Sequence, residues 1–345
     1  MKNTKAILKI PGTMEIRDAE YPTPKDDEVL IKVEYVGICG SDIHGFESGP
    51  FIPPKDPNQE IGLGHECAGT VVEVGSKVKK FKKGDRVCIE PGVPCGKCRF
   101  CLEGKYNICP NVDFMATQPN YRGALTNYLC HPESFVYHLP DNMYIMEGAL
   151  VEPASVGIHA AMTANVKPGH KVAILGAGCI GLMTLQGCKI MGCNDIIVVD
   201  VIDKRLDMAK KLGASQTING KGDTVSKIKE IFGELGADVV FETAGSPITA
   251  KQTQDIVMRG GKIMIVGTIP GETPINFLKI NREVTIQTVF RYANRYPVTI
   301  SAISSGKFDV TSMVTHQFNY KDVQKAFEDS VNCKNEIIKS VIKID

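Results

Sequence analysis

The sequence predicts an α/β protein of two domains: a β-rich domain, and a doubly wound parallel sheet with helices on both faces. Three observations favour this fold. The chain has 345 residues, too many for one small module. Its first half holds short β-branched runs broken by glycine and proline, and after Glu152 strands alternate with helical patterns. Its 43% hydrophobic and 23% charged residues are typical of a soluble globular protein with a sizeable core.

The β-rich half is predicted from three runs separated by turn residues. Period-two and β-branched patterns predict strands over Val29–Val36, Gly69–Val74 and Asp85–Ile89. A Lys-Gly-Asp turn at residues 83–85 separates the last two strands. Glycine and proline are frequent throughout this half, which favours a compact arrangement of short strands over long helices.

The second half predicts βαβ units. Strands are expected over Lys171–Leu175, Asp195–Asp200, Ala237–Glu242, Lys262–Val266 and Glu283–Thr288, with helices over Gly178–Met191 and Lys204–Leu212 and a stop at Gly213. The alternation indicates a parallel sheet covered on both faces. Residues 172–191 are apolar enough to suggest a membrane span, but polar interruptions make a strand, a turn and a buried helix the better explanation.

The last part of the chain is predicted to continue with a helix over Val298–Ser304, a strand, a helix over Lys321–Cys333 and a final strand. Periodicity alone does not decide which domain this tail joins. The formal net charge of +1 gives no reason to expect binding to nucleic acid or to an anionic membrane. The N-terminal residues lack a secretory pattern, so the twelve cysteines are expected to be thiols and metal ligands in a reducing, cytoplasmic compartment.

The first chemical motif is a run of four cysteines spaced C-x2-C-x2-C-x7-C: Cys95, Cys98, Cys101 and Cys109. Four thiolates in one loop can close a tetrahedral site on one zinc ion, and Gly96 and Gly104 let the backbone turn around it. An iron–sulfur cluster is an alternative, because Pro110 follows the fourth cysteine as in bacterial ferredoxins; four reduced thiols are another. The seven-residue gap and the lack of a second cysteine run favour structural zinc.

The second motif is the glycine-rich segment GAGCIG at residues 176–181, which follows a predicted strand and opens a predicted helix. Gly176 allows the tight turn, Gly178 lets the backbone approach a pyrophosphate, and Gly181 lets the helix pack against the strand. Asp200 ends the next strand, where a carboxylate can accept both ribose hydroxyls of NAD. NAD is therefore favoured over NADP, although a nearby Arg205 could accommodate a 2′-phosphate.

A third group of residues could hold a metal ion that takes part in chemistry. Cys39 lies in VGICGSDIH, the pair His65-Glu66 in GLGHE, and Glu152 in LVEPASVGIHA, all in contexts that read as β-rich or loop. A cysteine, a histidine and a carboxylate can hold zinc with one coordination position left open. Each residue alone is more often structural, so it is their joint occurrence beside a nucleotide motif that indicates a catalytic metal.

These motifs, in this order, resemble the zinc-dependent medium-chain dehydrogenase/reductase family over essentially the whole chain. Three further segments resemble the sorbitol/L-iditol 2-dehydrogenase kind of polyol dehydrogenase: EPASVGIHA (152–160), DFMATQPNYRGALTNY (113–128) and VFRYANRYPVTIS (289–301). The resemblance implies a GroES-like catalytic zinc domain formed by residues 1–154 and 289–345. It implies a Rossmann NAD-binding domain over residues 155–288.

The resemblance also implies roles for individual residues. Catalytic zinc would be bound by Cys39, His65 and Glu66, with Glu152 either ligating it or holding its water. Ser41 and His44 match the pair that relays the alcohol proton. The polyol pocket would be lined by Phe114, Thr117, Arg291 and Tyr292. The cofactor would contact the residues already named with the glycine-rich motif: Gly176, Gly178, Gly181, Asp200 and Arg205. It would also contact Ile180, Thr243, Val266, Val289, Phe290 and Arg291.

The implied reaction is the reversible, zinc- and NAD-dependent oxidation of a secondary alcohol of a sorbitol-, xylitol- or L-iditol-type polyol to the ketose. Two zinc ions per chain, one catalytic and one structural, and a homo-oligomer, tetramer or dimer, are also implied. Gly45 departs from the pattern, since animal relatives carry an aromatic residue there. The alternatives are a related zinc dehydrogenase acting on threonine, a diol or a sugar-alcohol phosphate, and a nucleotide-binding module with structural zinc alone.

Overall fold

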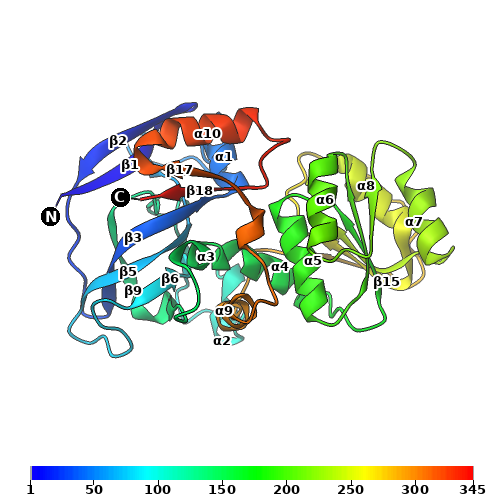
Figure 1. Ribbon diagram of the computed structural model, residues 1–345, viewed down its shortest axis with the longest axis horizontal. Helices are drawn as coiled ribbons and strands as arrows, with labels where there is room; N and C mark the ends of the chain where they lie inside the picture. Colours follow the sequence, from blue (N-terminus) through cyan, green and yellow to red (C-terminus); the bar gives the residue numbers. More distant parts are fainter. Residues whose placement is uncertain (1, 345) are drawn as a thin grey trace. The chain divides into compact units, whose positions relative to one another are not determined.

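The computed structural model describes residues 2–344, which form two compact units. The first unit takes in the chain up to Glu152, Tyr296–Ser304 and the chain from Val310 onward. The second contains Pro153–Arg295 and Ser305–Asp309. Figure 1 shows the elements of each unit in sequence colours.

The first unit is built on antiparallel strands. The largest sheet has the order β10-β6-β5-β3-β18-β17, with β9 also paired to β3; a smaller sheet has the order β2-β1-β4, and β7 pairs with β8. The strands are β1 (Asn3–Ile10), β2 (Thr13–Ala19), β3 (Glu28–Ile38), β4 (Ile61–Gly62), β5 (Glu66–Val74), β6 (Arg86–Ile89), β7 (Gly92–Val93), β8 (Asp113–Phe114), β9 (Tyr128–Pro132), β10 (Val136–His138), β17 (Val314–Asn319) and β18 (Lys339–Lys343). β18 joins the sheet beside β3, so a strand from the end of the chain borders the segment that leads to Cys39.

Short helices surround these sheets. They are α1 (Gly40–Ser48), α2 (Arg99–Leu102), α3 (Ile145–Ala149), α9 (Tyr296–Ser304) and α10 (Val323–Asn332), with 3-10 turns η1 (Tyr106–Ile108), η2 (Glu133–Phe135), η3 (Thr311–Met313) and η4 (Tyr320–Asp322). α1 and α10 lie side by side, because the rings of Phe46 and Phe327 pack with centroids 5.3 Å apart (Figure 1). These rings belong to the apolar core that also contains Val29, Ile31 and Val71.

The second unit is a six-stranded parallel sheet with the order β13-β12-β11-β14-β15-β16. Numbered within the unit this is 3-2-1-4-5-6, the doubly wound order of dinucleotide-binding sheets. The strands are β11 (Lys171–Leu175), β12 (Asp195–Asp200), β13 (Gln216–Asn219), β14 (Ala237–Glu242), β15 (Val257–Ile265) and β16 (Thr285–Thr288). The order reverses between β11 and β14, which is the point where ligands bind in such sheets.

The crossover helices of this sheet are α5 (Cys179–Ile190), α6 (Asp203–Lys211), α7 (Thr224–Phe232) and α8 (Pro247–Ile256). Apolar residues of the strands and of α7, including Leu175, Ile197 and Phe232, form a buried cluster. Gly213, with a φ of 97°, follows the last turn of α6 and ends it in the left-handed conformation.

The fold class expected from the sequence is confirmed, and the strands at 171–175, 195–200 and 237–242 have the predicted bounds. One local prediction was wrong. Glu152, expected in a β-rich or loop context, lies in the first turn of α4 (Val151–Thr163). The α1 helix was also not predicted. The resemblance placed residues 289–295 in the catalytic domain, but they lie in the second unit. At the start of this segment, the Val289 N–H donates to the Ile265 carbonyl at 2.8 Å and prolongs the sheet edge.

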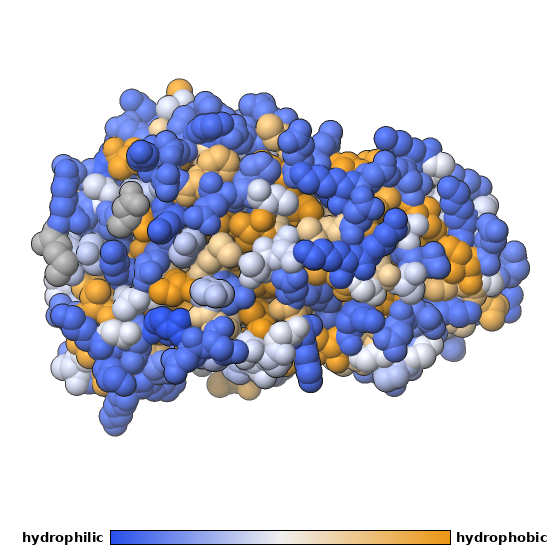
Figure 2. Space-filling model, viewed as in Figure 1, coloured by the Kyte–Doolittle hydropathy of each residue, from blue (hydrophilic) through white to orange (hydrophobic). Residues whose placement is uncertain are grey.

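No helix within residues 2–344 is long and apolar enough to cross a membrane. The apolar stretch at 172–191 forms β11 and α5, as predicted. On the face shown in Figure 2, hydrophilic side chains predominate and apolar ones lie in small groups among them.

Candidate active site

The four-cysteine loop brings its sulfur atoms together. The Sγ atoms of Cys98 and Cys101 lie 3.4 Å apart, those of Cys95 and Cys109 3.6 Å, those of Cys98 and Cys109 3.8 Å, and those of Cys95 and Cys101 4.0 Å. A zinc ion bound at about 2.3 Å by four thiolates requires sulfur separations of about 3.8 Å. The loop therefore fits one tetrahedral ion, and it is too tight for a cluster in which each thiolate binds a different iron.

Backbone geometry supports this loop. Gly96 and Gly104 have φ values of 70° and 72°, the left-handed region in which glycine is favoured. Backbone N–H groups of Lys97 and Cys98 lower the pKa of the Cys95 thiol to about 6, because they donate to the thiolate form. Burial and hydrogen bonds with neighbouring thiols raise the pKa of Cys101 to about 12, so the case for a metal site rests on the sulfur geometry.

A buried carboxylate fastens the loop to the first unit. Glu90, 1% exposed, accepts hydrogen bonds from the hydroxyls of Tyr106 at 2.7 Å and Tyr137 at 2.9 Å. Burial raises the pKa of Glu90, and the two hydroxyls partly oppose the change. Tyr106 lies between the third and fourth cysteines, so Glu90 ties the metal loop to β10.

Residues from two separate parts of the sequence form a second metal-binding group. The ligand atoms of Cys39, His65 and Glu66 all lie within 4.8 Å of one another, with the histidine and glutamate buried. Cys39 follows β3, and the other two stand at the start of β5, next to β3 in the sheet. A thiolate, an imidazole and a carboxylate can hold zinc with one position open, so this group fits a catalytic ion.

Asp42 organises this group. Cys39 is the N-cap of α1, and Asp42 at the third helical position accepts from the Cys39 N–H at 3.0 Å. The other oxygen accepts from the Gly64 N–H at 2.8 Å and lies 3.6 Å from Nδ1 of His65. At 3.6 Å this contact is too long for a hydrogen bond, so Asp42 places a negative charge behind the His65 ring.

The charges around His65 reinforce this arrangement. Burial lowers the pKa of His65, but Asp42 and Cys39 outweigh it and hold that pKa well above its usual value. Burial raises the pKa of Asp42, and His65 more than offsets this, so the net shift is downward. The centre therefore attracts positive charge, which a divalent cation can supply.

Two glycines make room for the metal group. A Cβ on Gly37 would overlap the Glu66 carboxylate, and a Cβ on Gly64 would lie 2.8 Å from a methyl of Val36. Gly64 also has a φ of 86°, in the left-handed region. Glycine is therefore needed on both sides of the buried pair His65-Glu66.

The predicted proton-relay residues lie on α1 directly after Cys39. Ser41 is exposed and His44 half-buried. The His44 ring stacks on that of Phe51, with centroids 3.8 Å apart and an interplanar angle of 9°. At Gly45, the position of the departure from animal relatives, a Cβ would lie 3.3 Å from a methyl of Leu63. An aromatic ring thus still lies against this part of the helix, supplied by Phe51.

Glu152 does not join the metal group, since its carboxylate is outside the set of ligand atoms found within 4.8 Å among residues 2–344. It is 5% exposed, and its charge helps to raise the pKa of Cys67, which burial raises most. Cys67 follows Glu66 in β5. Glu152 is therefore close enough to influence this strand without being placed as a direct ligand.

The predicted pocket residues of the first unit lie beside His65. The ring of Phe114, 6% exposed, has its centroid 5.5 Å from that of His65. The Thr117 hydroxyl donates to the Phe114 carbonyl at 3.1 Å. Phe114 therefore places one aromatic ring beside the metal group.

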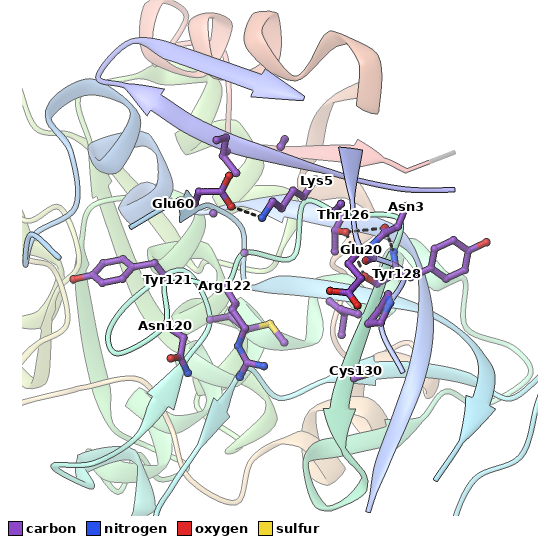
Figure 3. A pocket seen from close by; sticks show the side chains of 18 of the residues that line it. Asn3, Lys5, Glu20, Glu60, Asn120, Tyr121, Arg122, Thr126, Tyr128 and Cys130 are labelled. Carbon is purple, nitrogen blue, oxygen red and sulfur yellow. Dashed lines mark hydrogen bonds and ion pairs between the residues drawn. The ribbon is translucent and has the colours of Figure 1, made fainter. Parts of the chain in front are cut away.

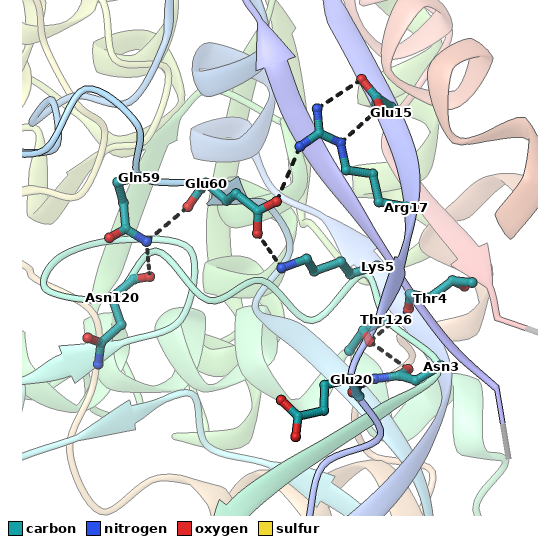
Figure 4. A network of polar contacts seen from close by, with 10 residues as sticks. All are labelled: Asn3, Thr4, Lys5, Glu15, Arg17, Glu20, Gln59, Glu60, Asn120 and Thr126. Atoms are coloured by element: carbon teal, nitrogen blue, oxygen red, sulfur yellow. Dashed lines mark hydrogen bonds and ion pairs between the residues drawn. The ribbon is translucent and has the colours of Figure 1, made fainter.

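A cavity of about 420 Å³ lies between β1 and residues 113–130 and is not lined by the metal group (Figure 3). Its polar side chains pair with one another: Lys5 forms an ion pair with Glu60, and the Thr126 hydroxyl donates to Asn3 at 3.1 Å. Figure 4 shows these pairs within a wider surface network. This cavity therefore lies apart from the metal group, and several of its charged side chains are paired.

The glycine-rich segment forms the predicted turn at the sheet's switch point. Gly176 has a φ of 113°, and a Cβ on Gly181 would overlap the Gly176 carbonyl and lie 2.8 Å from the Thr243 hydroxyl. Gly178 is the N-cap of α5, and a Cβ there would meet no atom within 4 Å. The turn thus leaves open space at a helix N-terminus, as a pyrophosphate requires.

The predicted ribose-binding carboxylate lies beside this turn. Asp200 accepts hydrogen bonds from the N–H groups of Ala177 at 2.7 Å and Ile202 at 3.0 Å. Arg205 lies 3.9 Å from it. The Thr243 hydroxyl donates to the Gly176 carbonyl at 2.8 Å, so it supports the turn from β14. Ile180 stands in the first turn of α5.

The remaining predicted residues also belong to the second unit. Val266 and Val289 prolong the ladders of β15 and β16 through backbone hydrogen bonds. Phe290 is 53% exposed, and the Arg291 guanidinium lies over its ring at 4.8 Å. Tyr292 is 3% exposed.

Two residues at the metal group were missed by the sequence analysis: Asp42 and Lys339. Asp42 could have been found from its spacing, three residues after an N-cap. Lys339, at the start of β18 and 2% exposed, forms an ion pair with Glu66. Its only sequence signal is a lysine in the run IIKSVI, where Ser340 is the only other polar residue.

Comparisons with known proteins agree with this architecture. Residues 25–141 match the model of the alcohol dehydrogenase GroES-like domain, and residues 179–305 match that of zinc-binding dehydrogenases. The chain is 44% identical to the sorbitol dehydrogenase of Bacillus subtilis (strain 168) over 347 residues, which cover 99% of this chain and 97% of the relative. The chain therefore belongs to the zinc-binding medium-chain dehydrogenase/reductase family. It is a zinc-dependent alcohol dehydrogenase of the polyol dehydrogenase branch.

A nearer relative is the "uncharacterized zinc-type alcohol dehydrogenase-like protein YdjJ" of Escherichia coli (strain K12), 76% identical over 100% of this chain and 99% of its own. The crystal structure of an Escherichia coli oxidoreductase/dehydrogenase of unknown specificity involved in membrane biogenesis superposes with a TM-score of 0.99, at 75% identity and full coverage of both chains. 2R,3R-butanediol dehydrogenase from Bacillus subtilis has a TM-score of 0.90, at 29% identity over 99% of this chain and 100% of its own.

Proposed function

We propose that this protein oxidises a secondary alcohol of a sugar alcohol reversibly to the ketose, with NAD as the hydride acceptor. In the forward direction the alcohol loses a hydride to NAD⁺ and a proton to solvent, giving ketose, NADH and H⁺. Sorbitol, xylitol and L-iditol are the proposed kinds of substrate. The observation that carries the proposal is the convergence of Cys39, His65 and Glu66 into a three-ligand group.

Zinc bound by this group would act as a Lewis acid that lowers the pKa of a coordinated hydroxyl. The chain's own residues hold that centre: Asp42 places a negative charge 3.6 Å from the His65 ring, and Gly37 makes room for Glu66. We assign proton relay to Ser41 and His44, which follow Cys39 on α1. Because Glu152 lies outside the ligand group, we propose that it acts through a water molecule and is not a direct ligand.

NAD is supported as the cofactor by the turn at 176–181 and by Asp200. The carboxylate is 7% exposed and stands beside that turn. A 2′-phosphate would meet its negative charge, and Arg205 at 3.9 Å is already drawn toward Asp200. We therefore propose a preference for NAD over NADP.

A polyol is favoured over a simple alcohol by the likeness to sorbitol dehydrogenase over the whole chain. We propose that Phe114 and Thr117 line the substrate pocket beside His65. We assign Arg291 and Tyr292 to substrate binding by resemblance alone. A site that binds several hydroxyls discriminates strongly against analogues that lack them. A diol is the second candidate, because the fold also resembles a butanediol dehydrogenase.

The test combines a substrate screen with a metal count. NAD reduction is measured with sorbitol, xylitol, arabinitols, galactitol, butanediol and threonine, and zinc is counted per chain. We expect polyol-dependent NADH formation and two zinc ions. Cys39→Ser should abolish turnover, retain the zinc of the four-cysteine loop and leave NAD binding intact. Turnover in the metal-depleted protein would contradict the proposal, and one zinc per chain would favour a nucleotide-binding module.

We also propose that the protein forms a homo-oligomer in a reducing compartment such as the cytoplasm. Within residues 2–344, β16 is a sheet edge whose outer side is unpaired, and such edges pair readily with another chain. Ile286 on this strand and Phe277 and Leu278 before it are exposed apolar residues, at 37%, 71% and 81%. All twelve cysteines are free thiols. Light scattering of wild type and Ile286→Lys tests the assembly: a monomeric wild type would refute it.

A further inference from the structure

A buried lysine touches the metal group from the end of the chain. Lys339 begins β18, which pairs with β3 so that Ser340 stands opposite Ile38. Its Nζ donates to the Ile38 carbonyl at 2.8 Å and forms an ion pair with Oε2 of Glu66. The side chains of lysine and glutamate are 2% and 1% exposed. One ammonium group thus contacts both Ile38, the residue before the ligand Cys39, and Glu66, which is itself a ligand of the same centre.

We propose that Lys339 is a positioning residue that shares the Glu66 carboxylate with the catalytic zinc, weakens zinc binding by charge repulsion and keeps the centre one positive charge higher. This inference rests on the proposed zinc at Cys39, His65 and Glu66. Lys339 occupies one carboxylate oxygen, which leaves the other for the metal.

The charges explain why a lysine is useful at this place. The thiolate of Cys39 and the carboxylate of Glu66 together cancel the two charges of a zinc ion, and Asp42 adds a further negative charge. Lys339 offsets that charge, so the centre does not become anionic. An anionic centre would hold the deprotonated alcohol poorly, whereas a neutral or cationic one stabilises it.

The same charges oppose the metal. Ammonium and zinc repel one another in a buried site, where screening by water is weak. Removing the charge of Lys339 should therefore tighten zinc binding and slow turnover together. A lysine that only braces the fold predicts the opposite, because partners behind a ligand normally raise metal affinity and their loss lowers it about 10- to 100-fold.

The experiment uses Lys339→Gln, which keeps N–H donors on a side chain one atom shorter and removes the charge. Lys339→Met removes both, and Lys339→Arg restores the charge. Lys334→Met is the matched control, because that lysine is 54% exposed and pairs with Glu47 at 3.1 Å. Zinc affinity is measured on the full-length protein by competition with a chelator, and the four-cysteine site gives an internal reference in each variant.

We expect Lys339→Gln to hold the catalytic zinc roughly tenfold tighter and to lower kcat by roughly tenfold, with the reference site unchanged. Lys339→Arg should return both values toward wild type, and Lys334→Met should change neither. Unchanged or weaker zinc binding in Lys339→Gln overturns the inference. A wild-type protein that binds only one zinc per chain instead overturns the proposed function, so the two failures are distinguishable.

Discussion

Gly178→Ala separates the fold of the dinucleotide turn from its use as a binding site. Gly178 caps α5 with a φ of −68° and a ψ of −177°, a conformation that alanine adopts readily. The added Cβ would meet no atom within 4 Å. The protein itself therefore tolerates the methyl group, and only a ligand at the helix N-terminus would meet it.

The expected magnitudes follow from this geometry. Alanine is a poorer N-cap than glycine but reduces the entropy of the unfolded chain, so the free energy of unfolding should change by no more than about 0.5 kcal/mol. A methyl group forced against a pyrophosphate resembles overpacking, which costs about 1–3 kcal/mol. That corresponds to a weakening of NAD binding by roughly 5- to 150-fold.

Calorimetric titration with NADH and urea denaturation measure the two quantities. Gly222→Ala is the matched control, because its nearest atom is the flexible end of Lys227 at 3.6 Å. Gly181→Ala should instead destabilise the fold, since its Cβ overlaps the Gly176 carbonyl. Wild-type NADH affinity in a stably folded Gly178→Ala would refute the placement of the pyrophosphate.

Three more outcomes are expected. Cys98→Ser should lose the structural zinc and lower the melting temperature while the catalytic zinc stays bound; two zinc ions in this variant would contradict the tetrahedral site. Burial lowers the pKa of His131 to about 4 in the folded protein. The stability contributed by its neutral form is therefore complete above pH 6.5, and roughly 3 kcal/mol is lost as the pH falls toward 4. The urea midpoint of His131→Gln should fall less with acid than that of wild type, and an equal fall would argue against this account. Phe51 is 61% exposed, and its ring stacks on that of His44. Phe51→Ala should change KM for polyols by about two- to tenfold with stability unaltered, and a KM equal to that of wild type would exclude a substrate role.

The features that the sequence predicted are those in which the chemistry lies within a few consecutive residues. The cysteine spacing fixes a loop that can wrap one ion, and the structure brings those sulfurs to 3.4–4.0 Å. The glycines at 176–181 follow a strand of the predicted bounds, because conformational freedom and helix capping act locally. The βαβ alternation then implies the sheet, since parallel strands need covering helices.

The features it did not predict depend on tertiary packing. Glu152 reads as a loop residue because Pro153 follows it, yet proline is well tolerated in the first turn of a helix, where α4 begins. α1 was missed because Gly40 and Gly45 weaken helical propensity. Its helix is instead supported by Asp42 at the N-terminus and by Phe46 packed on Phe327.

Lys339 shows the same limit most clearly. In a linear reading, a lysine among isoleucines and valines of a final strand indicates an exposed face, since lysine is almost never fully buried without a partner. The partner, Glu66, stands 273 positions earlier, and the two meet because β3 pairs with β18 on one side and with β5, which begins at Glu66, on the other. A buried charge of this kind is costly unless it is compensated. The position of Lys339 against the ligand Glu66 is therefore better explained by an effect on the net charge of the metal centre than by a contribution to folding stability. The zinc affinities of the Lys339 variants distinguish these two explanations.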